Sequence, residues 1–339
     1  MVLANKVLEA LPSVADSKTA SEEWVRPLGE AKLSGRNHCV LFVKPECLAI
    51  GEGVDVKAIL KLVLSSLKQH DVKTGAVRIM NGPYLGRYRI MEQHYGVINR
   101  ASCLGEEALS APTREKLEQD CPDFDRILGA HQLIEQFPEI TPFALNVMTD
   151  TMGTKKLAGG KYYFVLKIAG QRTVVLNPFH PQQIAHYTQA GKSIVIFECQ
   201  TDTDWEVLRR DMTGATDPTR AVEGSIRRTL LENKDKLGLH DVSTASNGVH
   251  FSAGPLEGMV EFCRFFSEHA KKQHISPIET PFGHMLAEHG VSEKDIVALA
   301  DNPILGDGGD GTYAFNLTEE KNAEAAAELL AKLVKKKAA

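Results

Sequence analysis

The sequence predicts an α/β sandwich, because strand-like and helix-like segments alternate along its first clear elements. Residues 39–43 form an apolar run of strand length, which ends before Pro45 because proline cannot donate to a strand ladder. Apolar residues then recur at helical spacing over 56–67. A second strand at 75–80 leads into a helix that ends near Tyr95, so the order of elements is strand, helix, strand, helix.

Residues 103–175 differ in character and predict an inserted subdomain. The segment opens with polar residues, is punctuated by prolines, and closes with two apolar runs at 162–168 and 173–176. These runs flank a turn that contains glycine, which is typical of a β-hairpin.

The alternation of strands and helices resumes after this insertion. Residues 193–197 predict a buried strand, and Asp204 is placed to cap a helix that reaches Arg210. A short strand at 249–252 and a helix at 256–266 follow. The chain is thereby divided into an N-terminal extension (1–37), a main domain (38–102 and 176–270), the insertion (103–175) and a C-terminal extension (271–339).

The C-terminal extension differs in composition from the main domain. Its glycine-rich stretch at 307–311 is better explained as a turn than as a calcium loop, because the liganding glutamate and the loop spacing are missing. An alanine-rich segment at 319–334 predicts a helix.

Composition and charge exclude several classes of protein. Charged residues make up 24% and hydrophobic residues 43% of the 339 residues, as in soluble globular proteins. The net charge of −5 and the isoelectric point near 6.2 argue against general nucleic-acid binding and against binding to anionic membranes. The start of the chain does not resemble a signal peptide, and no apolar run is long enough to cross a membrane. The six cysteines form no CxxC pair, so we expect a cytoplasmic protein without a zinc site.

Two segments near the end of the main domain carry the polar residues of greatest chemical interest. The first runs from Arg210 through Thr216 to Arg227 and includes a glycine- and proline-containing turn. The second contains Asn247 and His250, and Glu261 follows at helical distance. Taken alone, a histidine between valine and phenylalanine would more often be a half-buried structural residue, so its surroundings decide the interpretation.

In these segments the sequence resembles the nucleoside diphosphate kinases. That family has an arginine, a GxTxP turn, a PGTIR-type stretch and an NxxHGSD strand, and the segments above follow the same order. About ten extra residues, near 232–241, lie between Arg227 and Asn247 and lengthen the approach to the strand of His250. Lys44-Pro45-Glu46 stands where the family has a KPD motif, and Tyr95 stands where it has a tyrosine. The resemblance covers roughly 40–102 and 176–268. It implies a ferredoxin-like βαββαβ fold, with a four-stranded antiparallel sheet and helices on one face and over the edge.

The resemblance also implies a ping-pong transfer of phosphate between nucleotides. His250 would be the nucleophile, since a neutral imidazole attacks without prior deprotonation. Glu261 would fix the orientation of the ring. Lys44, Arg210 and Arg227 would surround the phosphates, because this chemistry needs positioning and neutralisation of charge.

The remaining site residues would bind the rest of the nucleotide. Thr216 and Tyr95 would offer hydroxyls to phosphate oxygens, and Asn247 would hydrogen-bond the sugar. The base would stack on Phe179, which tolerates any base and favours a broad range of NTP and NDP substrates. Mg²⁺ is implied as part of the nucleotide, so no dedicated metal ligands are expected. Arg209 and Arg228 are interpreted as solvated helix faces.

The sequence departs from the family pattern at several positions, and these departures leave alternatives open. Phe251 follows the histidine where the family has glycine, and it either crowds the phosphate or points into the core from the opposite strand face. Ala253 replaces an aspartate. Glu223 replaces the proline of a loop used in subunit contacts, so a homo-oligomer is allowed but the usual hexamer is not implied.

Two rival functions remain beside the kinase hypothesis. The first is a catalytically weak scaffold or nucleotide-sensing module that binds a protein partner. The second is phosphotransfer from His250 to a protein.

Overall fold

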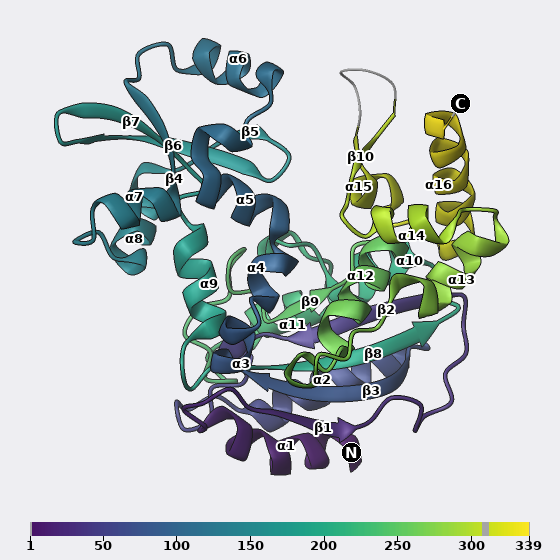
Figure 1. The fold of residues 1–339 in the computed structure, drawn as a ribbon. Coiled ribbons are helices and arrows are strands. Elements are labelled where there is room, and N and C mark those ends of the chain that lie inside the picture. Colours follow the sequence, from purple (N-terminus) through teal and green to yellow (C-terminus); the bar gives the residue numbers. More distant parts are fainter. Residues whose placement is uncertain (1, 307–311, 339) are drawn as a thin grey trace. The chain divides into compact units, whose positions relative to one another are not determined.

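The computed structural model describes residues 2–306 and 312–338, so the glycine-rich turn expected at 307–311 lies outside the described residues. The chain forms two compact units (Figure 1). The first combines Met1–Tyr88 with Ala190–Ala339, and the second is Arg89–Gln189. Among the described residues, no helix is long and apolar enough to cross a membrane.

The first unit is built on an antiparallel sheet, which confirms the expected class of mixed helices and antiparallel strands. Its strands run in the order β1-β3-β8-β2-β9, and each neighbouring pair is antiparallel. They are β1 (Glu22–Arg26), β2 (Asn37–Val43), β3 (Lys73–Asn81), β8 (Ser193–Thr201) and β9 (Val249–Phe251). The expectation of a four-stranded sheet was wrong, because β1 from the N-terminal extension pairs with β3 and adds a fifth strand.

Alternation along the central strand β2 sends its side chains to opposite faces of the sheet. Cys39, Leu41 and Val43 join the main hydrophobic core. That core is completed by α1 (Val2–Ala15), α2 (Val56–Gln69) and α11 (Ile226–Glu232). Asp55 caps α2, since its carboxylate accepts a hydrogen bond from the Ala58 amide.

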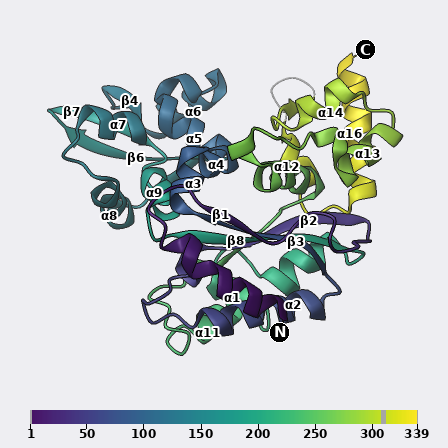
Figure 2. The same ribbon diagram turned by 60° about the horizontal axis from the view of Figure 1, so that its bottom comes forward.

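Helices cover both faces of this sheet, so the expectation of helices on one face was also wrong (Figure 2). The second face is covered by α12 (Pro255–Phe266). The ring centroids of Phe42 and Phe265 are 5.3 Å apart, and those of His38 and Phe262 are 4.6 Å apart. The reason is that β2 is apolar on both faces, and a sheet buried on both faces needs a helix layer on each.

The C-terminal extension packs on the outer side of α12 and forms a second hydrophobic core with it. Leu256, Met259 and Val260 of α12 belong to that core. The extension comprises α13 (Pro281–Glu288), α14 (Glu293–Leu299), β10 (Ile304–Leu305), β11 (Thr312–Tyr313), α15 (Ala314–Thr318) and α16 (Ala323–Ala338). The expected alanine-rich helix is present, but it begins at Ala323 because Asn322 instead accepts hydrogen bonds from Asn37 and from the Trp205 amide.

The second unit holds the expected hairpin. Strands β6 (Lys161–Ile168) and β7 (Gln171–Leu176) pair around Ala169 and Gly170, which both have positive φ, as a two-residue hairpin turn requires. The sheet order is β4-β7-β6-β5, with β4 (Arg126–Gly129) and β5 (Lys155–Ala158). Its helices are α4 (Ile90–His94), α5 (Gly96–Leu104), α6 (Ala111–Asp120), α7 (Ala130–Gln136), α8 (Pro142–Met152) and α9 (His180–Thr188). The insertion expected at 103–175 lies within this unit, which begins earlier and ends later.

Candidate active site

His250 is held in the middle of the short strand β9, at the edge of the first unit's sheet. It pairs with Phe42 across the strands, and the two rings stack with centroids 4.7 Å apart. Because Val249 and Phe251 join the main core, alternation turns His250 to the opposite face, toward α12. Its side chain is 18% exposed, so a ligand can reach a ring that is otherwise packed.

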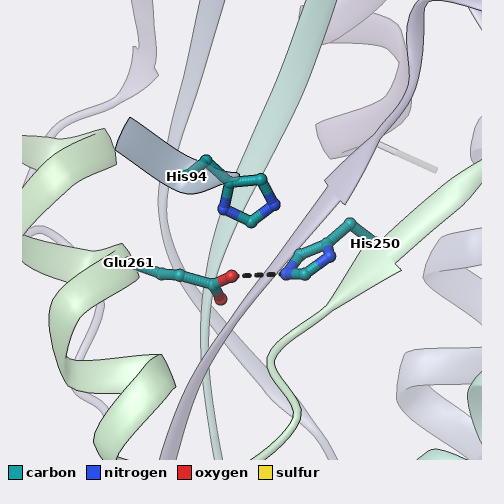
Figure 3. Close-up of side chains that lie close together, drawn as sticks. All are labelled: His94, His250 and Glu261. Carbon is teal, nitrogen blue, oxygen red and sulfur yellow. Dashed lines mark hydrogen bonds and ion pairs between the residues drawn. The ribbon is translucent and has the colours of Figure 1, made fainter. Parts of the chain in front are cut away.

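The Glu261 side chain of α12 points toward the His250 ring (Figure 3). Its Oε1 lies 2.5 Å from His250 Nε2, and its Oε2 accepts a hydrogen bond of 2.5 Å from the Ser252 hydroxyl. Glu261 is fully buried. Since Nε2 faces the carboxylate, Nδ1 is the ring nitrogen suited to attack a phosphate.

Ser252 is a positioning residue that our assignment of roles did not include. Its hydroxyl also accepts a hydrogen bond from the Val40 amide, so it links the carboxylate to the central strand. The signal in the sequence was its spacing, since residues two apart on a strand share a face.

Lys44 brings a buried positive charge beside the histidine. Its side chain is 7% exposed, and Nζ donates a hydrogen bond of 2.7 Å to Oδ1 of Asn247. The backbone of Lys44 donates to the Gly248 carbonyl, which fixes the residue next to β9. Burial lowers the pKa of Lys44 to about 8; the charge of Glu46 raises it, whereas that of Arg227 lowers it. The amine therefore sits close to losing its proton in the absence of an anion.

Arg227, near the start of α11, adds a second buried cation. It is 5% exposed, and it donates through Nη1 to the Gly214 carbonyl and through Nη2 to the Val249 carbonyl, each at 3.0 Å. Gly214 has a φ of +89°, and a Cβ there would lie 2.5 Å from the Ser225 hydroxyl. Glycine is therefore required for this loop to pack against the start of α11.

Asn247 connects Lys44 to the loop that precedes α11. It is buried, and its Nδ2 donates to the carbonyls of Thr216 and Thr244 at 3.1 Å and 3.2 Å. In this structure the Asn247 amide therefore hydrogen-bonds other groups of the protein, and its role toward a sugar stays a prediction. The Thr216 side chain is exposed, so its hydroxyl is accessible to a ligand.

The arginine pair that precedes this loop is arranged differently from our expectation. Arg210 is 56% exposed, and it donates to both oxygens of the neighbouring Asp211 and pairs with Glu206. Arg209, expected on a solvated face, is only 20% exposed and pairs with Glu319 and Glu320 of the C-terminal extension. Both arginines lie in a π-helical turn, Leu208–Thr213, and such a turn changes the direction in which successive side chains point.

Tyr95 and Phe179 belong to the second unit, so their expected roles stay predictions. The Tyr95 hydroxyl lies 3.2 Å from the Tyr187 hydroxyl. Phe179 precedes α9, and its ring is 5.8 Å from that of Tyr162 in an edge-on arrangement.

Burial and neighbouring charges set the protonation of the His250–Glu261 pair. Burial lowers the pKa of His250 well below its usual value, and the positive charges of Lys44 and Arg227 lower it further. Burial raises the pKa of Glu261 to about 8, although the Ser252 hydrogen bond and Arg264 act in the opposite direction. The imidazole is therefore neutral at pH 7, which is the state that a nucleophile needs.

Two further charged residues of α12 extend this cluster and were not singled out from the sequence. Burial, together with the charge of Glu261, raises the pKa of Glu257 to about 8. Arg264 lies on the other side of Glu261 and opposes these carboxyl shifts. Residues 257, 261 and 264 share one helix face, so their spacing was the signal that could have identified them.

The structure answers the question raised by Phe251. The residue is fully buried in the main core, and its ring lies 6.0 Å from that of Trp205. It points away from the face that carries His250, so it does not crowd a phosphate there.

No family model matches the chain. Over 73 residues it is 34% identical to a nucleoside diphosphate kinase of Rhodopseudomonas palustris (strain BisA53), a match that covers 22% of this chain and 45% of that protein. The chain thus spans less than half the length of this relative, and the similarity indicates a distant relationship to such kinases over that stretch.

A solved structure, the NDP kinase from Pyrobaculum aerophilum, aligns with 69% of this chain and 97% of its own. The TM-score is 0.35 and the sequence identity 16%. At these values the alignment has no bearing on fold or activity.

Proposed function

We propose that this protein is a nucleoside diphosphate kinase that works through phospho-His250. The observation that carries the proposal is the hydrogen bond between His250 Nε2 and the buried carboxyl of Glu261, beside the buried cations Lys44 and Arg227. A neutral, oriented imidazole next to fixed positive charge is the arrangement that phosphoryl transfer needs.

The reaction has two half-steps. Nδ1 of His250 attacks the γ-phosphorus of an NTP, the bond from phosphorus to the bridging oxygen breaks, and the NDP leaves with that electron pair. A terminal phosphate oxygen of a second NDP then attacks the phosphohistidine, and the phosphorus–nitrogen bond breaks. Throughout, Glu261 accepts a hydrogen bond from Nε2–H and stabilises positive charge on the ring.

The other site residues would hold the nucleotide. Lys44 and Arg227 would neutralise charge on the phosphate oxygens, with Thr216 donating its hydroxyl. Tyr95 would contribute a second hydroxyl, and stacking on Phe179 would accept any base. These roles of Tyr95, Phe179 and Thr216 rest on the resemblance described above.

Mg²⁺ belongs to this proposal as part of the substrate. The cations Lys44 and Arg227 beside His250 suit phosphate oxygens. Mg²⁺ would supply charge neutralisation by bridging phosphate oxygens of the bound nucleotide.

The arrangement of the sheet supports the same proposal. Without β1, the order β3-β8-β2-β9 has the first and third strands of the expected βαββαβ unit at its centre, as a ferredoxin-like fold requires. A homo-oligomer and a cytoplasmic location remain part of the proposal.

The test is a labelling and chase experiment. Purified protein incubated with γ-labelled ATP and Mg²⁺ is expected to form an acid-labile phosphoprotein, and unlabelled GDP is expected to remove the label as GTP. The His250→Ala variant should stay unlabelled. Nucleotide binding without labelling would replace the kinase with a sensing module, and label that GDP cannot remove would favour transfer to a protein.

A further inference from the structure

The helical segment that contains Arg209 is tied to the strand that carries His250. Trp205, at the start of α10 (Trp205–Val207), is fully buried, and its Nε1 donates a hydrogen bond of 3.0 Å to the Ser252 carbonyl. Ser252 lies two residues beyond His250. Arg209 follows Trp205 by four residues, so it lies within about one helical turn of this buried anchor.

The C-terminal extension fixes the Arg209 side chain near the end of this strand. Nη2 of Arg209 donates to Glu319 Oε1 at 3.2 Å, and Nε lies 3.7 Å from Glu320 Oε1. The Glu320 amide in turn donates to the Ala253 carbonyl at 2.9 Å. Ala253 is the third residue after His250. The Arg209 guanidinium is therefore held beside the backbone that follows the candidate nucleophile.

Gly254 permits this close approach. A Cβ at position 254 would lie 2.3 Å from the Thr318 carbonyl oxygen, which no real structure tolerates without movement. The absence of a side chain therefore lets the segment that bears Glu319 and Glu320 lie directly against the end of β9.

Arg210, the arginine that the sequence pattern assigns to phosphate binding, is engaged elsewhere. Its guanidinium is occupied by Asp211 and Glu206 and is largely exposed. Arg209 is the less exposed of the two, and among the described residues its recorded contacts use Nε and Nη2. A guanidinium presents five N–H groups, so Nη1 of Arg209 is left to donate to an anion.

We propose that Arg209 is a further phosphate-binding residue of the site and that Glu319 and Glu320 hold it in position. The inference rests on the proposed function. It specifies that Arg209 is the further cation that binds phosphate together with Lys44 and Arg227. The electrostatics at His250 are consistent with this assignment. The charge of Arg209 is among those that lower the pKa of His250, whereas that of Arg210 is not.

The test compares Arg209→Ala, Arg209→Lys, Arg210→Ala and, as a surface control, Arg228→Ala, whose guanidinium pairs with Glu232. Calorimetry measures the Kd of each folded variant for MgADP and for inorganic tripolyphosphate, and labelling measures phosphohistidine formation. Loss of one charge-assisted hydrogen bond should weaken both ligands about 10- to 100-fold in Arg209→Ala. Arg209→Lys should recover part of that loss, and Arg228→Ala should match the wild type.

The role of the two glutamates is tested by the Glu319→Gln/Glu320→Gln double variant. If the carboxylates position Arg209, this variant should weaken tripolyphosphate binding in the same direction as Arg209→Ala, and combining it with Arg209→Ala should add little. Tighter binding in the double variant would instead mean that the carboxylates compete with phosphate and would overturn the positioning role.

The outcomes separate this inference from the kinase proposal. A larger loss in Arg210→Ala than in Arg209→Ala, or equal Kd values for Arg209→Ala and wild type, would overturn the assignment of Arg209. A wild type that binds both ligands but forms no phosphohistidine would overturn the kinase alone, and the Kd values would still judge Arg209. A wild type that binds neither ligand would overturn both.

Discussion

At the scale of single residues, the buried pair His250–Glu261 should make the reaction depend on pH. With Glu261 protonated, its carboxyl donates to Nε2 and the ring proton lies on Nδ1, which then cannot attack. As pH rises through the Glu261 pKa of about 8, the carboxylate accepts from Nε2–H and Nδ1 gains its lone pair. The second-order rate constant of phosphohistidine formation, which reports the free enzyme, should therefore rise between about pH 6 and about pH 8.

The same rate constant should fall above about pH 8, because Lys44 has a pKa of about 8 and loses its charge there. Two variants distinguish the rise of the rate constant with pH, the rising limb, from its fall above about pH 8. Lys44→Arg, if folded by circular dichroism, should remove the fall above about pH 8, since arginine stays charged. Glu261→Gln should remove the rising limb and lower the rate about 10- to 100-fold. A profile that is the same in Glu261→Gln and wild type would exclude this pair as the origin of the pH dependence.

Phe251 offers a second test at this scale, because its position separates stability from catalysis. Phe251→Ala removes a fully buried ring from the main core and should lower the free energy of unfolding by about 3–5 kcal/mol. Denaturant titration followed by the fluorescence of Trp24 and Trp205, both in the first unit, measures the loss. Val297→Ala, at a residue of the first unit that is 47% exposed, should change it by less than about 0.5 kcal/mol. Slower labelling of the folded Phe251→Ala fraction would indicate a role in the site after all.

At the scale of elements, the sequence predicted what local pattern determines and missed what depends on distant partners. The apolar runs at β2 and β8 and the amphipathic α2 and α12 were visible because burial imposes their periodicity. Strand β1, with the sequence Glu-Glu-Trp-Val-Arg, has no such pattern. It is a strand because it pairs with β3, where Arg78 contacts Glu22 and lies over the Trp24 ring.

The same distinction between local pattern and distant contacts applies to the candidate site. Lys44, Asn247, His250 and Glu261, which the sequence singled out, all lie in the first unit, where Lys44 donates to Asn247 and His250 hydrogen-bonds Glu261. The spacing could not show that Arg209 pairs with Glu319 and Glu320, because these partners lie more than a hundred residues later in the chain. Contacts over such separations leave no periodic trace in a single sequence.

The C-terminal helix α16 should support the site through α12. Leu330 is fully buried in the core that α16 shares with the outer side of α12. Leu330→Ala should lower the free energy of unfolding of the first unit by about 2–5 kcal/mol, whereas Lys332→Ala, at an exposed position, should have little effect. Tryptophan fluorescence in urea distinguishes them, and equal stability of the two variants would show that the C-terminal core does not support the sheet unit.

At the scale of the whole molecule, charge is distributed unevenly in a way that favours a small anion over a polyanion. The chain carries a net charge of −5, yet Lys44 and Arg227 place buried positive charge at one point. A small anion can meet these cations with its charged groups alone, whereas a polyanion would also meet the net negative charge of the chain. The overall charge and the local cluster therefore select for the size of the ligand as well as its sign.

Ligand binding should consequently stabilise the unit that holds these cations. At about 100 times its Kd, MgADP should add about 2.7 kcal/mol to the free energy of unfolding of the first unit, because it binds the folded state alone. The two tryptophans report this unit selectively, so thermal unfolding followed by their fluorescence measures the shift. His250→Ala should keep the shift, since the variant removes the nucleophile but not the cations, whereas Arg227→Ala should lose most of it. A shift that disappears in His250→Ala but persists in Arg227→Ala would mean that the ring, rather than the charge around it, supplies the binding energy.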